Sequence, residues 1–150
     1  MQAFIKRKKT VRGAGTPKPV AKKNVTTLVN KLDKIFSLYI RKRDAMPYGG
    51  RYFKCISCGR VLPFEQADCG HFWSRRHMAT RFDEDNCNAE CKGCNRFDGD
   101  HLLGYQANLI KKIGQRRYDI LNYKHTTIKK WSAFELEQLI EYYTILNKNL

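Results

Sequence analysis

The chain has 150 residues, with 29 Lys and Arg against 14 Asp and Glu, which gives a formal net charge of +15. This length suits one domain with a modest core. The sequence contains neither a run of about 18 apolar residues for a membrane span nor the apolar stretch of a signal peptide, so we expect a cytoplasmic protein without membrane contact. The charge favours a polyanionic partner, above all nucleic acid; the alternative is a solvated basic tail that only aids solubility.

Residues 1–24 form a basic segment with eight Lys or Arg and no acid. Gly and Pro interrupt this segment and it has no apolar period, so we predict a disordered arm that adds salt-dependent affinity for nucleic acid. The rest of the chain, 25–150, is predicted to form one domain in three parts. These are a helix at 25–45, a cysteine-rich core at 51–101 and helices at 102–150.

The helix at 25–45 is predicted from apolar residues that recur at steps of three and four. Asn24 is its expected N-cap, and the sequence Pro-Tyr-Gly-Gly at 47–50 ends it. We expect the apolar stripe to pack on the core of the domain; the alternative is a dimer interface. The stripe consists of Val25, Leu28, Val29, Leu32, Ile35, Phe36, Tyr39 and Ile40.

Two cysteine pairs, Cys55 with Cys58 and Cys91 with Cys94, have the spacing of a four-cysteine zinc site. Four thiolates complete a tetrahedron around one zinc and leave no open position, so this zinc is predicted to be structural. Chance pairs and a redox pair are the weaker alternatives. The 32 residues between the pairs exceed the length of a simple zinc finger, so another element must fold there.

Within the cysteine-rich core, the residue pattern predicts a strand at 52–56, a hairpin of strands at 61–64 and 67–73, and a short helix at 91–98. The chain after this core is predicted to be helical. Its last helix begins at a capping box formed by Ser132 and Glu135. Two shorter helices, at 102–113 and 115–122, are expected before it.

Several other Cys and His residues match no motif. Cys69 and Cys87 have no partner at ligand spacing, so we interpret them as small buried thiols. His77, His101 and His125 are interpreted as ordinary surface or packing residues, although His77 lies beside two arginines that suit phosphate contact.

Three further residues complete a recognisable order: His71 in the predicted hairpin, Asn86 five residues before the second cysteine pair, and Asn95 directly after that pair. This order resembles the HNH (His-Me finger) nucleases, and it is similar in more detail to the phage NinG (Rap) recombination nucleases. The resemblance implies an α+β fold: a zinc-stabilised treble-clef ββα-metal (HNH) core with flanking N- and C-terminal α-helices. It extends over residues 25–146, and its shared sequences are Cys55-Ile56-Ser57-Cys58-Gly59, Asp68-Cys69-Gly70-His71-Phe72, Arg81-Phe82-Asp83-Glu84-Asp85-Asn86, Cys91 to Asn95 and Leu109-Ile110-Lys111-Lys112-Ile113-Gly114.

The resemblance implies a role for each of these side chains. His71 would be the general base, Asn95 a ligand of a catalytic Mg²⁺ or Mn²⁺, and Asn86 the residue that fixes the loop orienting His71. Many HNH enzymes have a metal-binding Asp directly before the histidine, where this chain has Gly70. Asp68 shares a strand face with position 70, so we propose it as the first metal ligand; its alternative role is a hairpin hydrogen bond. We expect His71 and Asn95 to face each other across one cavity.

The implied activity is metal-dependent, structure-selective cleavage of branched DNA such as Holliday junctions and D-loops during phage recombination. The chain would be encoded by a phage or prophage and act in the cytoplasm of the bacterial host. Cutting a junction symmetrically needs two active sites, so a homodimer is expected, with the helix at 25–44 and the C-terminal helix as candidate interface. Alternatives are a zinc-dependent DNA-binding module without catalysis, an adaptor in a recombination complex, and an HNH nickase acting on linear duplex.

Basic side chains are expected to contact the phosphate backbone, which suits recognition of DNA by shape rather than by sequence. For Arg81, a structural salt bridge to Asp83 or Asp85 is the alternative. The predicted DNA-binding residues are Arg75, Arg76, Arg81, Lys111, Lys112, Arg116 and Arg117.

Overall fold

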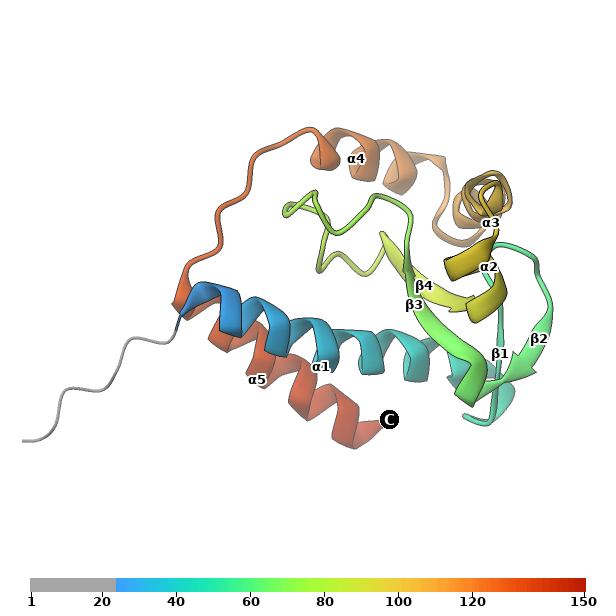
Figure 1. Cartoon of the computed structure of the whole chain (residues 1–150), viewed down its shortest axis with the longest axis horizontal. Helices are drawn as coiled ribbons and strands as arrows, with labels where there is room; N and C mark the ends of the chain where they lie inside the picture. The colour runs from blue at the N-terminus through green and yellow to red at the C-terminus, as the bar shows by residue number, and fades with distance from the viewer. Residues whose placement is uncertain (1–23) are drawn as a thin grey trace, which may run out of the picture.

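The structure is a computed structural model and describes residues 24–150, so the predicted basic arm lies outside the described residues except for Asn24. The described chain has the expected mixed α+β character, with two sheets of two strands each. None of the described helices is both long and apolar enough to cross a bilayer. In chain order (Figure 1), the elements are α1 (Val25–Ala45), the 3₁₀ turn η1 (Met46–Tyr48), β1 (Tyr52–Lys54), β2 (Val61–Pro63), the 3₁₀ turn η2 (Phe64–Gln66), β3 (Ala67–His71), β4 (Cys87–Cys91), α2 (Lys92–Phe97), α3 (His101–Ile113), α4 (Gln115–His125) and α5 (Ala133–Asn149).

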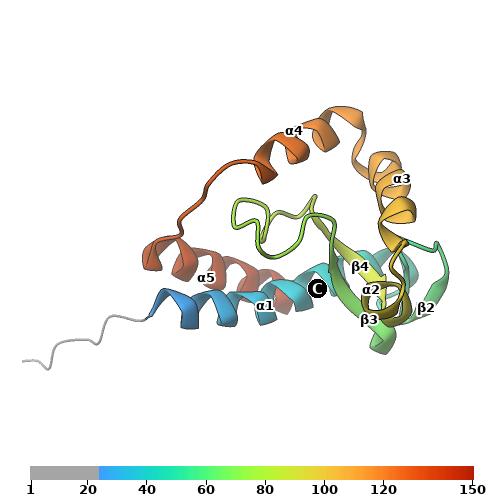
Figure 2. The same cartoon turned by 45° about the horizontal axis from the view of Figure 1, so that its top comes forward.

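The helices α1 and α5 lie side by side and enclose a hydrophobic core (Figures 1 and 2). Leu32, Phe36 and Ile40 of α1 pack against Leu136 and Ile140 of α5, and burial of each such side chain contributes about 1.5–3 kcal/mol. The stripe of α1 therefore packs inside the domain, as expected. Because these two faces bury each other, they are not available to a second chain.

Both helices begin at the predicted caps. The side chain of Asn24 accepts a hydrogen bond from the Thr26 N–H at 2.9 Å. In α5, Ser132 Oγ accepts from the Glu135 N–H at 3.2 Å, while Glu135 Oε2 accepts from the Ser132 N–H at 2.8 Å. The capping box is therefore confirmed, and it satisfies backbone donors that no helical hydrogen bond reaches.

The strand pairing differs from the predicted one. β1 pairs with β2, whereas β3 pairs antiparallel with β4, which sets Asp68 opposite Glu90 and His71 opposite Cys87. The predicted hairpin between 61 and 73 is wrong because it leaves out β4. All five residues of β4 are buried, so the strand lacks the alternation of polar and apolar residues by which a half-buried strand is recognised.

The β3–β4 hairpin lies between two helical layers, with the α1–α5 pair on one side and α3 and α4 on the other (Figures 1 and 2). On the α3 side, Tyr105 and Leu109 form a second core with Tyr118 and Leu121 of α4 and with Ile56. This arrangement buries residues on both faces of the hairpin and holds its strands in a fixed register.

Gly104 allows α3 to lie directly against the turn that carries the first cysteine pair. A Cβ at this position would lie 2.3 Å from the carbonyl oxygen of Ser57, a backbone atom that has little freedom to move. Next to this contact, Asn108 Nδ2 donates to the Ile56 carbonyl at 2.8 Å. The absent side chain of Gly104 therefore determines how closely α3 approaches the turn that carries Cys55 and Cys58.

Candidate functional site

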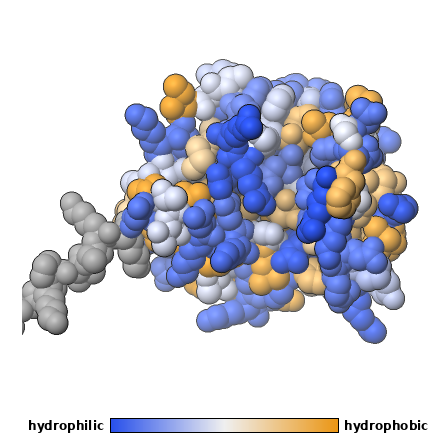
Figure 3. Space-filling model, viewed as in Figure 1, coloured by the Kyte–Doolittle hydropathy of each residue, from blue (hydrophilic) through white to orange (hydrophobic). Residues whose placement is uncertain are grey.

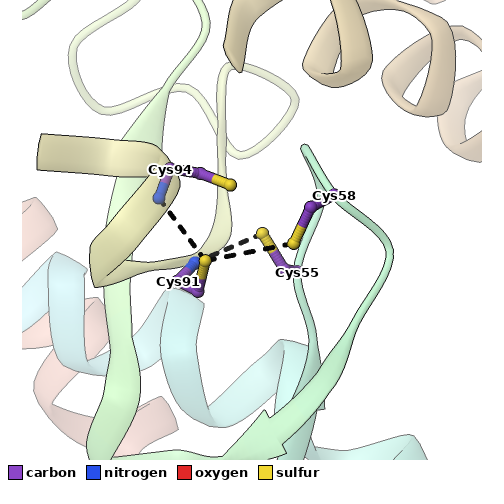
Figure 4. Close-up of side chains that lie close together, drawn as sticks. All are labelled: Cys55, Cys58, Cys91 and Cys94. Atoms are coloured by element: carbon purple, nitrogen blue, oxygen red, sulfur yellow. Dashed lines mark hydrogen bonds between the residues drawn. The ribbon is translucent and has the colours of Figure 1, made fainter. Parts of the chain in front are cut away.

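The four motif cysteines come together at the junction of both hairpins and α2, as Figure 4 shows. Cys55 and Cys58 lie in the turn after β1, Cys91 ends β4, and Cys94 lies in the first turn of α2. Their sulfur atoms all lie within 4.8 Å of one another, and the Cys91 N–H donates to Cys55 Sγ at 3.3 Å. Four convergent sulfur donors fit zinc, so this cluster can hold a metal ion such as zinc.

Arg60 places positive charge beside this cluster. Its Nε donates to Cys58 Sγ at 3.4 Å, and its Nη2 lies 3.9 Å from Cys91 Sγ. Burial opposes ionisation of Cys58, but the hydrogen bonds from Arg60 and its neighbours outweigh burial and lower the pKa of this thiol to about 6. The lowered pKa favours the thiolate form of Cys58, the form that binds metals.

Asp68 and Asn95, the two predicted ligands of the catalytic cation, are in contact. Asn95 Nδ2 donates to Asp68 Oδ2 at 3.1 Å. Arg96 also binds this carboxylate with both arms, Nε to Oδ2 at 2.7 Å and Nη2 to Oδ1 at 2.9 Å. Burial tends to raise the pKa of Asp68, but these hydrogen bonds outweigh burial and lower it. A cation bound by Asp68 would therefore have to compete with Arg96 for the carboxylate.

His71 ends β3 and is half-buried. Its Nδ1 lies 3.3 Å from the carbonyl oxygen of Cys69, and its Nε2 lies 3.2 Å from the carbonyl oxygen of Arg81. Burial, and then the positive charge of Arg75, lower the pKa of His71 to about 4. The imidazole is therefore neutral at pH 7 and retains a nitrogen lone pair.

The predicted site residues are divided between the two faces of the β3–β4 hairpin. Side chains alternate along a strand, so Asp68 and His71, three positions apart, point to opposite faces. His71 lies with Cys69 on the face toward α1, and Asp68 contacts Asn95 on the other. The expectation that His71 and Asn95 face each other across one cavity is therefore corrected: the structure brings together Asp68 and Asn95, but not His71.

Asn86 is fully buried and ties together the loop that joins β3 to β4. Its Oδ1 accepts from the Trp73 N–H at 2.7 Å, and its Nδ2 donates to the carbonyls of Trp73 at 2.9 Å and Thr80 at 3.0 Å. The amide thus fixes both the start and the middle of the loop after His71. These contacts agree with the loop-fixing role that the resemblance implies for Asn86.

A buried carboxylate explains why glycine precedes His71. A Cβ on Gly70 would lie 2.2 Å from Oε2 of Glu90, which is fully buried in the neighbouring strand. The Oε1 atom of Glu90 accepts from Ser57 Oγ at 2.5 Å and contacts His101 Nδ1 at 2.7 Å. His101 is therefore not an ordinary surface residue, and Glu90 is a residue that the sequence pattern did not reveal.

Replacement of Gly70 by Ala is expected to destabilise the protein, because the new methyl group displaces the Glu90 carboxylate from its hydrogen bonds. Overpacking of this kind costs about 1–3 kcal/mol, or roughly 2–12 °C in Tm for a chain of this size. Thermal unfolding followed by circular dichroism measures the change. Gly99→Ala is the matched control, since its Cβ would meet nothing within 4 Å. Equal Tm values for both variants would contradict the packing argument.

Ion pairs within the domain engage part of the predicted DNA-binding set. Arg81 binds the carboxylate of Asp33 at 3.0 and 2.5 Å. The expected partners, Asp83 and Asp85, are not the ones observed. Arg117 binds Asp85 at 3.0 Å, and Lys112 Nζ contacts Asp44 at 2.7 Å. The four other predicted residues are exposed and are paired with no acid in the described ion pairs: Arg75, Arg76, Lys111 and Arg116.

One family model and several curated relatives match this chain. The family model described as Bacteriophage Lambda NinG protein matches residues 3–150. The chain belongs to the NinG family. Relatives named Protein ninG come from Escherichia phage 933W, with 32% identity over 108 residues, Escherichia phage lambda, with 31% over 114, and Salmonella phage P22, with 30% over 112. These matches cover 71%, 73% and 74% of this chain.

The matches to NinG relatives cover only part of those proteins. This chain spans about half the length of each, 50% for phage 933W, 52% for lambda and 51% for P22. No solved structure matches the chain.

Proposed function

We propose that this NinG-family chain is a metal-dependent DNA endonuclease that cuts branched recombination intermediates, such as Holliday junctions and D-loops, by HNH chemistry on a treble-clef zinc scaffold. The observation that carries the proposal is the order of elements around the cysteine cluster: the cysteine turn, then the β3–β4 hairpin, then helix α2. His71 ends β3, and Asn86 fixes the loop that follows it. A motif of this kind holds catalytic side chains on rigid elements close to a structural metal.

The side chains suit phosphodiester hydrolysis. His71 would accept a proton from the attacking water, because its imidazole is neutral at pH 7 and retains a nitrogen lone pair. Asp68 and Asn95 offer oxygen atoms, the ligands that Mg²⁺ and Mn²⁺ prefer. When bound there, the cation would supply Lewis-acid stabilisation of the charge that develops on the phosphate. Amide and carboxylate oxygens of this chain would orient it.

This mechanism sets a condition on the hairpin. His71 has to leave the carbonyls of Cys69 and Arg81, and Asp68 has to exchange Arg96 for the cation. The end of β3 must therefore reorient when substrate and cation bind. Because His71 is the last residue of the strand, such a change breaks few ladder hydrogen bonds.

The surface of the described domain supports a DNA partner. A cleft of about 540 Å³ lies between α1, the cysteine turn and α3, and its charged residues are four cations and a single acid, Asp44. The face of the molecule in Figure 3 is predominantly hydrophilic. The positive charges that line the cleft can bind phosphates without regard to base sequence. The cations that line the cleft are Arg43, Lys54, Lys111 and Lys112.

Replacement of His71 by Ala is expected to reduce cleavage of a labelled four-way junction in Mg²⁺ by about 10²–10⁴-fold while junction binding is retained. Cleavage is measured on gels and binding by mobility shift, with a forked substrate and a linear duplex of identical sequence in parallel. Lys130→Ala is the control, since it removes a single exposed charge away from the hairpin. Absence of divalent-dependent cutting by the parent chain on every substrate would eliminate the enzyme.

A second candidate function is a zinc-dependent DNA-binding module without catalysis. The separation of His71 from Asn95 on opposite hairpin faces favours it. It predicts tight junction binding, no cleavage by the parent chain, and no effect of His71→Ala on affinity. Cleavage of the linear duplex at a defined sequence would instead identify a nickase of the same chemistry.

A further inference from the structure

The cleft between α1, the cysteine turn and α3 combines apolar surface with positive charge. Pro47, Tyr48 and Ile56 provide its apolar lining, and lysines from β1 and α3 stand beside them. Its volume of about 540 Å³ lies within the range of sites that enclose small organic molecules. A space of this size can admit a single nucleotide, whereas a double helix has to stay outside it.

Tyr48 offers this cleft an aromatic ring that is not already stacked. The residue is 36% exposed, and none of the described ring contacts includes it. Hydrogen bonds fix the turn that carries Tyr48: the Gly49 N–H donates to the Met46 carbonyl at 3.1 Å, and the Gly50 N–H to the Ala45 carbonyl at 3.0 Å. An aromatic ring held in place beside positive charge is the platform on which an unpaired base stacks.

Two of the four cations in the cleft are available to phosphate. Arg43 and Lys112 already bind the carboxylate of Asp44, at 2.9 and 2.7 Å. Lys54 of β1 and Lys111 of α3 are exposed, and neither pairs with an acid in the described ion pairs. The phosphates of a strand that enters the cleft would therefore meet these two ammonium groups first.

Asn108 adds a hydrogen-bond acceptor to the lining of the cleft. Its Nδ2 donates to the carbonyls of Ile56 at 2.8 Å and Ser57 at 3.4 Å, which fixes the orientation of the amide. Its Oδ1 takes part in no described hydrogen bond, so it can accept one from a ligand. Each nucleobase has an N–H donor on its Watson–Crick edge, and this edge is free only when the base is unpaired.

We propose that this cleft binds an unpaired nucleotide of single-stranded DNA, with the base stacked on Tyr48 and the phosphates at Lys54 and Lys111. Asn108 Oδ1 would accept a hydrogen bond from the edge of the base. The proposal rests on the DNA partner of the proposed function and not on cleavage. A D-loop contains a displaced single strand, so the cleft would favour this intermediate over linear duplex.

The test measures binding of a labelled oligothymidylate of about ten nucleotides to the full, zinc-loaded chain by fluorescence anisotropy, without added Mg²⁺. Tyr48→Ala is expected to weaken binding by about 5–150-fold, the factor that corresponds to one base–aromatic stack, while Tyr48→Phe keeps the ring and stays within about twofold of the parent. Tyr123→Ala is the matched control, because Tyr123 is 74% exposed on α4 and does not line the cleft. Circular dichroism confirms that each variant is folded.

The salt dependence of binding tests the two lysines separately. Lys54→Ala/Lys111→Ala is expected to reduce the slope of log affinity against log salt by about 1.4, since each phosphate contact on a single strand contributes about 0.7. Lys130→Ala/Lys148→Ala, which removes two exposed charges that do not line the cleft, is the control for net charge. Equal slopes for the two double variants would overturn the assignment of phosphates to Lys54 and Lys111.

Photocross-linking of the parent chain places the base without any substitution. An oligonucleotide that carries iodouracil is expected to cross-link to Tyr48, as located by mass spectrometry. Cross-links confined to segments that do not line the cleft would overturn the proposal, and so would a folded Tyr48→Ala variant with the parent's affinity or displacement of the oligonucleotide by an equal concentration of dTMP. Cross-linking at Tyr48 by a chain that cuts no substrate would refute the nuclease and leave this site intact.

Discussion

Cys58→Ser is expected to abolish zinc binding at the four-cysteine cluster and to unfold the two hairpins. Cys58 is exposed, so this substitution removes a ligand without removing core packing. Apparent binding free energies of structural zinc are about 10–16 kcal/mol, comparable with the whole free energy of unfolding of a domain, about 5–15 kcal/mol. We expect residues 51–101 to lose hydrogen-exchange protection and the chain to lose its cooperative thermal transition.

The control for this prediction is Cys58→His, which restores a zinc ligand because three cysteines and one histidine also form structural zinc sites. It should recover most of the metal content and the transition. Chelation of the parent chain with EDTA provides a second route to the same state. A Cys58→Ser variant with the parent's zinc content and Tm would show that the cluster does not hold the fold together.

Asp44→Ala is expected to lower the free energy of unfolding by about 3 kcal/mol, or roughly 6–12 °C in Tm. The Asp44 carboxylate joins three elements: it accepts from Arg43 at 2.9 Å, from Lys112 Nζ at 2.7 Å and from the Ala89 N–H at 2.7 Å. Its removal leaves the Ala89 N–H of β4 without this acceptor and takes the nearest acid from the Arg43 guanidinium, which keeps its contacts with Glu84 and Cys87. This expected loss in the free energy of unfolding is at the low end of the range for buried ion pairs, because the Lys112 side chain is 40% exposed.

The pH dependence of stability gives this prediction a second readout. Burial tends to raise the pKa of Asp44, but hydrogen bonds and charges from Arg43 and Lys112 outweigh burial and lower it. A carboxyl group with a lowered folded pKa stabilises the protein above its unfolded pKa and loses this effect as the pH falls through the folded value. The difference in Tm between Asp44→Ala and the parent should therefore shrink in acid. Asp119→Ala, at an exposed position of α4, should change stability by no more than about 0.5 kcal/mol.

The parts of the fold that follow local rules could be predicted from the sequence. The stripe of α1, the capping box at Ser132 and the two cysteine pairs each depend on spacing along one segment, and each lies where expected. The pairing of β3 with β4 depends on burial of Asn88 and Glu90, which tertiary hydrogen bonds make possible and no pattern in the sequence indicates.

The candidate site was only partly accessible to sequence reasoning. Strand alternation correctly relates Asp68 to position 70, and the same rule places His71 on the other face. The cluster of Cys69, His71 and Cys87 crosses two strands, so it follows only from the correct strand pairing. The spacing of Cys69 and His71, two positions apart on one strand, was the only sign in the sequence that these side chains share a face. The ion pair of Arg81 with Asp33 joins positions 48 residues apart and could not be read from local sequence.

The packing of α1 against α5 has a consequence for synthesis of the chain. α1 ends at Ala45 and α5 begins at Ala133, so residues 46–132 must be translated before the partner helix starts to emerge. At about 5–20 residues per second, the apolar stripe of α1 waits roughly 4–18 seconds in the nascent chain without its final cover. During that interval we expect the uncovered stripe to be accessible to chaperones, and messages that stop before codon 133 should yield products that are cleared by proteolysis.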